Sequence, residues 1–141
     1  MATTIDGLSD QQIAELLQQT HVIALLGASA KPQRPSYGVM AALLAAGYRV
    51  YPINPGQAGE EILGQRVYAS LDEVPEAIDM VDVFRAPDAA MDIARQAVSL
   101  GVKSVWYQLG VINGDALAYL QARSVPVVMD RCTKIEIARL M

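Results

Sequence analysis

A short polar loop at residues 27–39 carries the residue types that bind phosphate groups. The glycine and alanine at its start allow a ligand to approach the backbone closely. Two serine hydroxyls can donate hydrogen bonds, and an arginine can hold two phosphate oxygens at once. No Asp or Glu occurs from residue 16 to residue 59, so we expect a local anion site. The candidate binding residues in this loop are Gly27, Ala28, Ser29, Lys31, Arg34, Ser36 and Tyr37.

The elements that must position this loop follow from the apolar pattern. Short apolar runs alternate with longer periodic stretches, as in repeated strand and helix units. We therefore predict an α/β fold, a Rossmann-like open parallel five-stranded sheet with helices on both faces, in a single domain over residues 1–141. The predicted strands are 22–27, 48–54, 80–84, 102–108 and 125–130. The predicted helices are 10–19, 35–47, 71–77, 87–101, 113–123 and one from 133, the first lying in an N-terminal segment, 1–20, that precedes the sheet.

Several predicted helices begin at capping signals. Ser9 and Gln12 have the spacing of a capping box, in which each side chain bonds the other residue's backbone N–H. Thr133 and Glu136 repeat that spacing. Ser70 is a candidate cap for helix 71–77. The sequence thus predicts two capping boxes and one single cap.

The predicted fold gives the polar loop a functional position. Ligands of open parallel sheets bind beyond the carboxyl ends of the strands, where the strand order reverses. We expect that reversal between the first and the fourth predicted strands. The loop joins the first strand to helix 35–47, whose N-terminal N–H groups favour an anion.

The overall composition argues against several classes of protein. The 11 Lys and Arg residues face 15 Asp and Glu, and the net charge of −4 offers no general affinity for nucleic acid or acidic membranes. One cysteine and one histidine cannot build a disulfide framework or a structural zinc cluster. The chain lacks a membrane-length apolar run, and residues 1–10 lack a targeting pattern. We expect a cytoplasmic protein without a metal site.

Known nucleotide motifs narrow the ligand further. The G-x-G-x-x-G pattern is absent, and the second predicted strand ends without the acidic residue that binds an NAD ribose. NAD is therefore disfavoured. NADP stays open because Lys31 and Arg34 can meet its extra phosphate. The G-x-x-x-x-G-K-[ST] loop of ATP and GTP hydrolases is also absent.

The order of several short motifs resembles that of the stand-alone CoA-binding proteins, whose fold is similar to the CoA-binding domain of the succinyl-CoA synthetase α subunit. These motifs are GAS at 27–29, YPINPGQAGEEILGQRVYASLDEVP at 51–75, DVFRAP at 82–87, WYQLGV at 106–111 and MDRC at 129–132. The resemblance implies coenzyme A, or an acyl-CoA, lying over the strand ends. It implies phosphates near Ser29, Lys31 and Arg34. It implies the adenosine part near Pro52, Asn54, Phe84 and Arg85. The candidate cofactor-binding residues outside the polar loop are Pro52, Asn54, Pro55, Phe84, Arg85 and Gln108.

Catalytic residues are not apparent, so a non-catalytic CoA-binding module is the favoured function. His21, the only histidine, precedes the first strand and is expected at the opposite edge of the sheet, and Ser29 lacks the G-x-S-x-G context of a hydrolase nucleophile. The alternative is an enzyme, either a small NADP-dependent oxidoreductase or a CoA-dependent subunit completed by a partner chain. A homodimer also stays open, whereas nucleic acid and membrane partners are not expected.

Cys132 admits two interpretations. It is expected at the start of the last helix, next to Arg131 and near Lys134, where positive charge lowers the pKa of a thiol. A thiol that pairs with the CoA sulfhydryl is one hypothesis. A small residue packed at a strand-to-helix turn is the other, and we favour it.

Overall fold

The computed structural model describes residues 4–141 and has a five-stranded parallel sheet in the order β2-β1-β5-β6-β7. Four of these strands are buried along their whole length or all but one residue, as their continuous apolar sequences predict. The predicted fold class is confirmed, although the predicted range 1–141 begins three residues outside the described part. The strands of this sheet are β1 (Val22–Leu26), β2 (Arg49–Ile53), β5 (Met80–Val83), β6 (Ser104–Tyr107) and β7 (Val127–Met129).

The point where the strand order reverses differs from the prediction. It lies between β1 and β5, the first and third predicted strands, and not between the first and the fourth. After β2 the chain crosses over β1, and β5 pairs with the edge of β1 that β2 leaves open. All later strands then extend the sheet away from β2, and the crevice therefore opens above β1 and β5.

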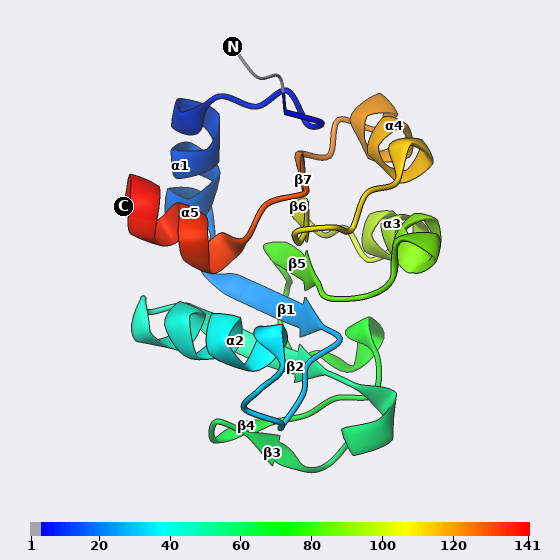
Figure 1. Cartoon of the computed structure of the whole chain (residues 1–141). Coiled ribbons are helices and arrows are strands. Elements are labelled where there is room, and N and C mark those ends of the chain that lie inside the picture. The colour runs from blue at the N-terminus through cyan, green and yellow to red at the C-terminus, as the bar shows by residue number, and fades with distance from the viewer. Residues whose placement is uncertain (1–3) are drawn as a thin grey trace.

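Within residues 4–141, α-helices cover both faces of the sheet (Figure 1). Helices α1, α2 and α5 lie on one face, and α3 and α4 lie on the other. No helix within residues 4–141 is long and apolar enough to cross a bilayer. The helices are α1 (Asp10–Gln19), α2 (Pro35–Ala45), α3 (Ala90–Ser99), α4 (Gly114–Ala122) and α5 (Thr133–Leu140).

The connection between β2 and β5 differs most from the sequence prediction. It contains a small antiparallel hairpin, β3 (Glu61–Ile62) and β4 (Gln65–Arg66), that the sequence did not indicate. The helix predicted at 71–77 is a single 3₁₀ turn, η2 (Leu71–Glu73). Ser70 does not cap it, because its hydroxyl donates to the Asp72 carboxylate instead. Two further 3₁₀ turns are η1 (Pro55–Gln57) and η3 (Pro87–Ala89).

One predicted capping box forms and the other does not. The Ser9 hydroxyl accepts the Gln12 N–H, and the Gln12 side chain accepts the Ser9 N–H, as predicted for α1. In α5 the cap position falls on Cys132, one residue before the predicted one. Thr133 instead donates to Asp82 of β5, and the Glu136 carboxylate accepts from Arg131 before α5 and from Arg139 within it, so this second box was predicted wrongly.

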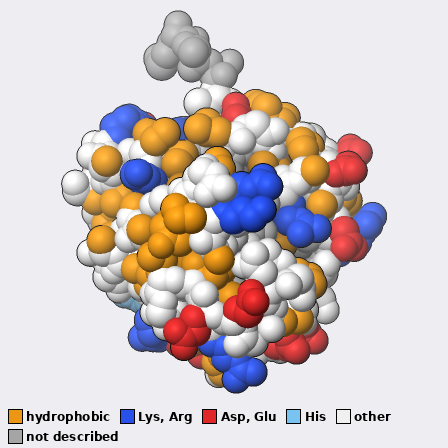
Figure 2. All heavy atoms as spheres, turned by 60° about the horizontal axis from the view of Figure 1, so that its bottom comes forward, with side chains coloured by type: hydrophobic (Ala, Val, Ile, Leu, Met, Phe, Trp, Pro, Cys, Tyr) orange, Lys and Arg blue, Asp and Glu red, His pale blue; other side chains and the backbone are white. Residues whose placement is uncertain are grey.

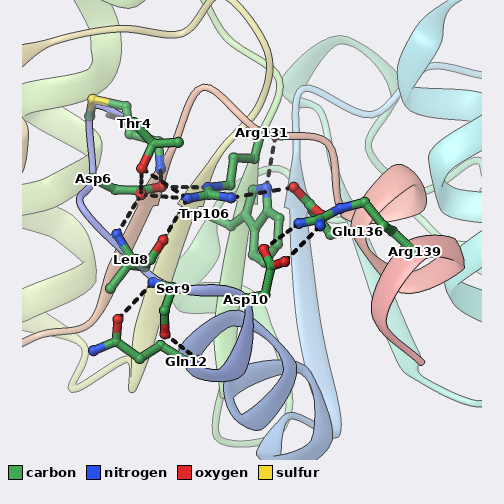
Figure 3. Close-up of polar contacts among 11 residues, drawn as sticks. Thr4, Asp6, Leu8, Ser9, Asp10, Gln12, Trp106, Arg131, Glu136 and Arg139 are labelled. Atoms are coloured by element: carbon green, nitrogen blue, oxygen red, sulfur yellow. Dashed lines mark hydrogen bonds and ion pairs between the residues drawn. The ribbon is translucent and has the colours of Figure 1, made fainter. Parts of the chain in front are cut away.

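A buried ion pair fastens the segment before α1 to the end of β7 (Figure 3). Arg131 Nε lies 2.9 Å from Asp6 Oδ2, and its Nη2 lies 2.9 Å from Oδ1. Both residues are buried. The third guanidinium nitrogen, Arg131 Nη1, donates to Glu136 Oε1 at 3.5 Å. The other oxygen of Glu136 accepts from Arg139 Nε at 2.8 Å. The residues of the β7–α5 turn are thus held from the side of α1.

Candidate ligand-binding site

A cavity of about 700 Å³ lies at the carboxyl edge of the sheet. The loops after β1, β2, β5, β6 and β7 all contribute to its lining, together with the first turn of α2. This is the position at which parallel sheets of this order bind ligands. The lining residues are Gly27, Ala28, Ser29, Lys31, Arg34, Pro35, Ser36, Val39, Asn54, Gln57, Phe84, Arg85, Ala86, Gln108, Leu109, Val111 and Cys132.

The β1–α2 loop is fixed at its start by a glycine that no other residue can replace without strain. Gly27 has a φ of +88°, and a Cβ at this residue would lie 2.1 Å from the carbonyl oxygen of Phe84. Its N–H donates to the Ile53 carbonyl oxygen, and Asn54 Nδ2 donates to the Ala28 carbonyl oxygen at 2.8 Å. These bonds attach the loop to the end of β2.

The cavity lining carries positive charge without acidic partners. Lys31, Arg34 and Arg85 are exposed, and none of the three forms an ion pair with the residues described. No Asp or Glu of residues 4–141 lines the cavity. The dipole of α2 also favours an anion at the N-terminus of this helix. No side chain of the described residues caps this end, so its N–H groups are not taken by a capping residue. Both Lys or Arg and Asp or Glu side chains occur on the face drawn in Figure 2, and the net charge of the chain is −4. The excess of positive charge at the cavity is therefore local.

Ten of the thirteen predicted binding residues line this cavity, and three do not. Pro52 is buried within β2, opposite Leu25 of β1. Tyr37 is half-buried and packs against the core between the sheet and α1, α2 and α5. Pro55 lies in a neighbouring cavity of about 240 Å³ that shares Gly27 and Arg85 with the main one.

Seven lining residues were not among the predicted ones. Most are apolar: Pro35 and Val39 lie in α2, and Ala86, Leu109 and Val111 lie in the loops after β5 and β6. Gln57, in η1, has a buried Oε1 atom without a hydrogen-bond partner among the described residues. A buried acceptor without a partner is costly, so a ligand that donates a hydrogen bond there would stabilise the wall of the cavity. No motif at this position signals that role.

A buried polar cluster lies behind Gln108. Asp82 is completely buried. Its Oδ1 accepts a hydrogen bond from Gln108 Nε2 at 2.6 Å, and its Oδ2 accepts one from the Thr133 hydroxyl at 3.0 Å. Burial raises the pKa of Asp82 to about 7, and these two hydrogen bonds only partly oppose the increase. Arg85 forms no ion pair with this carboxylate.

The raised pKa of Asp82 gives a testable pH dependence. The folded protein holds a proton on Asp82 up to about pH 7, whereas the unfolded chain releases it near pH 4. Stability from this group is therefore complete below pH 4 and is lost as the pH rises to about 7, by a few kcal/mol. Urea denaturation of the wild type and of Asp82→Asn at pH 5 and pH 8 measures it. The wild type should lose more stability than the variant, and equal losses would contradict the assignment.

The sequence suggested that the positive charge of Arg131 serves the Cys132 thiol, but other groups bind the Arg131 guanidinium. Its guanidinium is bound to Asp6, Glu136 and neighbouring groups on the side of α1 (Figure 3). Cys132 itself is half-buried, is the cap residue of α5 and lines the cavity. His21 lies immediately before β1, at the amino edge of the sheet, as predicted.

The fold and the cavity define a nucleotide-binding type of α/β protein, with its ligand site at the carboxyl edge of a parallel sheet. Comparison with protein families identifies the particular group. Residues 21–138 match the model of the family described as "CoA binding domain", and the chain belongs to this family. This membership supports CoA binding in general and confirms the resemblance read from the motifs.

Individual relatives agree with the family assignment. The chain is 35% identical to the uncharacterized protein YneT of Bacillus subtilis, over 90% of this chain and 93% of that protein. It is 33% identical to the α subunit of acetate–CoA ligase (ADP-forming) I of Pyrococcus furiosus, over 64% of this chain. That match covers only 21% of the ligase subunit, so the chain corresponds to about a fifth of its length.

Solved structures share the whole fold. A hypothetical protein from Pyrococcus horikoshii is 41% identical, with a TM-score of 0.92 and 99% of each chain covered. A protein from Thermus thermophilus is 40% identical, with a TM-score of 0.90, covering 95% of this chain and 100% of that one. The chain therefore shares its five-stranded parallel architecture with these two proteins.

Proposed function

We propose that this protein binds coenzyme A or an acyl-CoA without catalysing a reaction on it, through the cationic loop at the carboxyl edge of the sheet. The observation that carries this proposal is the cavity itself. Three cations with no acidic partner among the described residues surround a cavity of about 700 Å³ in a chain of the CoA-binding family.

The residues present fit the chemistry of CoA. CoA carries a pyrophosphate and a separate ribose phosphate, so it needs more than one cation. Lys31, Arg34 and Arg85 would supply them, and the uncapped N-terminus of α2 would add backbone N–H groups. Apolar lining residues such as Val39 and Val111 suit the uncharged arm of the cofactor.

A non-catalytic role is supported by the chemistry of the lining. Among residues 4–141, no histidine, aspartate or glutamate lines the cavity, so its wall lacks the side chains that most often act as general acid or base. The Asp82 carboxyl lies behind the wall, and its oxygens accept hydrogen bonds from Gln108 and Thr133. CoA binding by itself requires none of these groups.

A thermal-shift panel tests the proposal against its alternatives. The ligands are CoA, acetyl-CoA, NAD, NADP and ATP, each in excess. A ligand at 100 times its Kd adds about 2.7 kcal/mol to the free energy of unfolding. We expect CoA or acetyl-CoA to raise the melting temperature most. A shift caused by NADP alone would favour the oxidoreductase alternative and overturn the proposal.

Removal of the loop cations should weaken CoA binding strongly. In the double variant Lys31→Ala/Arg34→Ala we expect the Kd for CoA to rise about 100-fold, because charge-assisted hydrogen bonds contribute about 1.5 kcal/mol or more each. Isothermal titration calorimetry measures this change. Lys103→Ala is the matched control, since Lys103 is exposed and pairs with Asp79 at the opposite edge of the sheet.

The same variant distinguishes which phosphate the two cations hold. If they bind the ribose phosphate, the variant loses more affinity for CoA than for dephospho-CoA. Equal losses would place both cations at the pyrophosphate. An unchanged Kd for both ligands would contradict a cationic loop that binds CoA.

A second candidate is a CoA-binding subunit that acts with a partner chain, and the similarity to part of a ligase α subunit favours it. A gentle purification from native cells followed by native mass spectrometry separates the two. A complex of this chain with a second protein supports the subunit role. A single chain with bound CoA supports the stand-alone module.

A further inference from the structure

The side-chain amide of Gln108 is held in one orientation from inside the protein. Its Nε2 donates to Asp82 Oδ1 at 2.6 Å and to Thr133 Oγ1 at 3.1 Å. The Thr133 hydroxyl in turn donates to Asp82 Oδ2 at 3.0 Å, so the three side chains form a closed ring of hydrogen bonds. Above about pH 7, where Asp82 is ionised, turning the amide around would bring its oxygen against the carboxylate and hydroxyl oxygens of both partners and would lose both bonds.

This orientation leaves the amide oxygen as the free group of Gln108. Its side-chain oxygen accepts no hydrogen bond from the described residues, and the residue is only 4% exposed yet lines the cavity. Gln108 is therefore a fixed acceptor in the wall of a cavity that Phe84, Val111 and Cys132 also line. A fixed acceptor in apolar surroundings favours a ligand that donates a hydrogen bond and disfavours one that cannot.

We propose that Gln108 Oε1 accepts a hydrogen bond from an N–H or S–H group in the uncharged arm of the ligand, and that Asp82 and Thr133 are positioning residues that hold the amide for it. This inference rests on the proposed function, because CoA has such an arm, with two amide N–H groups and a terminal thiol. In this arrangement the cationic loop binds the phosphates, and Gln108 binds the uncharged arm.

The test separates the two parts of the ligand. Calorimetry is done with CoA, acetyl-CoA and adenosine 3′,5′-bisphosphate, which has ribose phosphates but no uncharged arm. In Gln108→Leu we expect about tenfold weaker binding of CoA and unchanged binding of the bisphosphate. An equal loss for acetyl-CoA excludes the thiol as the donor, and a loss confined to CoA assigns the donor to the thiol.

The positioning role has its own pair of variants, which also serves if Gln108→Leu does not fold. Thr133→Val removes one acceptor of Nε2 while keeping the shape of the side chain, and Thr133→Ser keeps the hydroxyl. We expect severalfold weaker CoA binding in Thr133→Val, restored in Thr133→Ser, with the bisphosphate unaffected in both. A purely structural role of Thr133 would weaken both ligands together.

Several results would overturn this inference. CoA affinity that is unchanged in a folded Gln108→Leu variant rejects it, as does an equal loss of affinity for the bisphosphate. In either case the wild type still binds CoA, and the proposed function stands. If the wild type binds none of the three ligands, the proposed function and this inference fail together.

Discussion

Replacing Arg131 by methionine should lower the free energy of unfolding by about 3 to 5 kcal/mol, because it leaves Asp6 as a buried charge without its partner. The Asp6 side chain is completely buried and that of Arg131 is 9% exposed, and two short contacts join them. Burial alone would raise the pKa of Asp6, but the guanidinium and the N–H groups of Leu8 and Met129 outweigh it and keep that pKa low. Urea denaturation at pH 7 measures the loss.

Two comparisons show whether the buried pair is the cause. Asp10→Ala breaks the exposed ion pair between Asp10 and Arg139, and we expect it to cost less than about 1 kcal/mol. The double variant Asp6→Asn/Arg131→Met should be more stable than Arg131→Met alone, since no unpaired charge remains. If Arg131→Met is no more harmful than Asp10→Ala, the network in Figure 3 does not stabilise the fold.

The low pKa of Asp6 also determines how far the pH can fall before the stability from its ionised carboxylate is lost. A carboxyl whose pKa is lowered on folding adds stability above its unfolded pKa, near pH 4, and loses it as the pH falls through the folded value. Asp82 behaves in the opposite way, because its stability is lost as the pH rises towards 7. The two buried carboxyls thus favour the folded state most around pH 4 to 5.

The sheet was predictable because its strands are continuous apolar runs between glycines, prolines and periodic segments. Each predicted strand overlaps an observed one, and α1 has the predicted bounds. The β3–β4 hairpin was missed because strands of two residues are too short for a periodic pattern. The reversal point was misplaced because strand order depends on which side of β1 the chain returns to, and local sequence does not encode that choice.

Local signals failed where distant side chains compete for the same group. Thr133 and Glu136 have the spacing of a capping box, but Asp82 takes the Thr133 hydroxyl and Arg131 and Arg139 take the Glu136 carboxylate. The contacts with Asp82 and Arg131 are buried, and buried bonds outweigh an exposed cap.

The candidate site was predictable mainly within its one continuous loop. Residues after β1 are adjacent in sequence, so their charge pattern is visible without a structure. Tyr37 belongs to the same stretch, but it lies one position beyond Ser36 on the helix and packs towards the core. Gln57 and Leu109 reach the cavity only through the fold, so no local motif marks them.

Replacing Gly27 by alanine should cost about 4 kcal/mol of stability and weaken CoA binding. The left-handed φ of +88° costs an alanine about 1 to 2 kcal/mol. The new Cβ would also lie 2.1 Å from the Phe84 carbonyl oxygen, so the ends of β1 and β5 must move apart, and overpacking of this kind costs about 1 to 3 kcal/mol. Thermal and urea denaturation measure the stability, and calorimetry with CoA measures the binding.

Gly59→Ala is a control that separates backbone strain from the steric clash. Gly59 has nearly the same φ, +86°, but no atom lies within 4 Å of the added Cβ, so only the strain of about 1 to 2 kcal/mol applies. The difference between the two variants is then the cost of separating the loop from Phe84. Equal losses would mean that this close approach is absent in solution. A larger loss in Gly27→Ala with weaker CoA binding would tie the position of the loop to the end of β5.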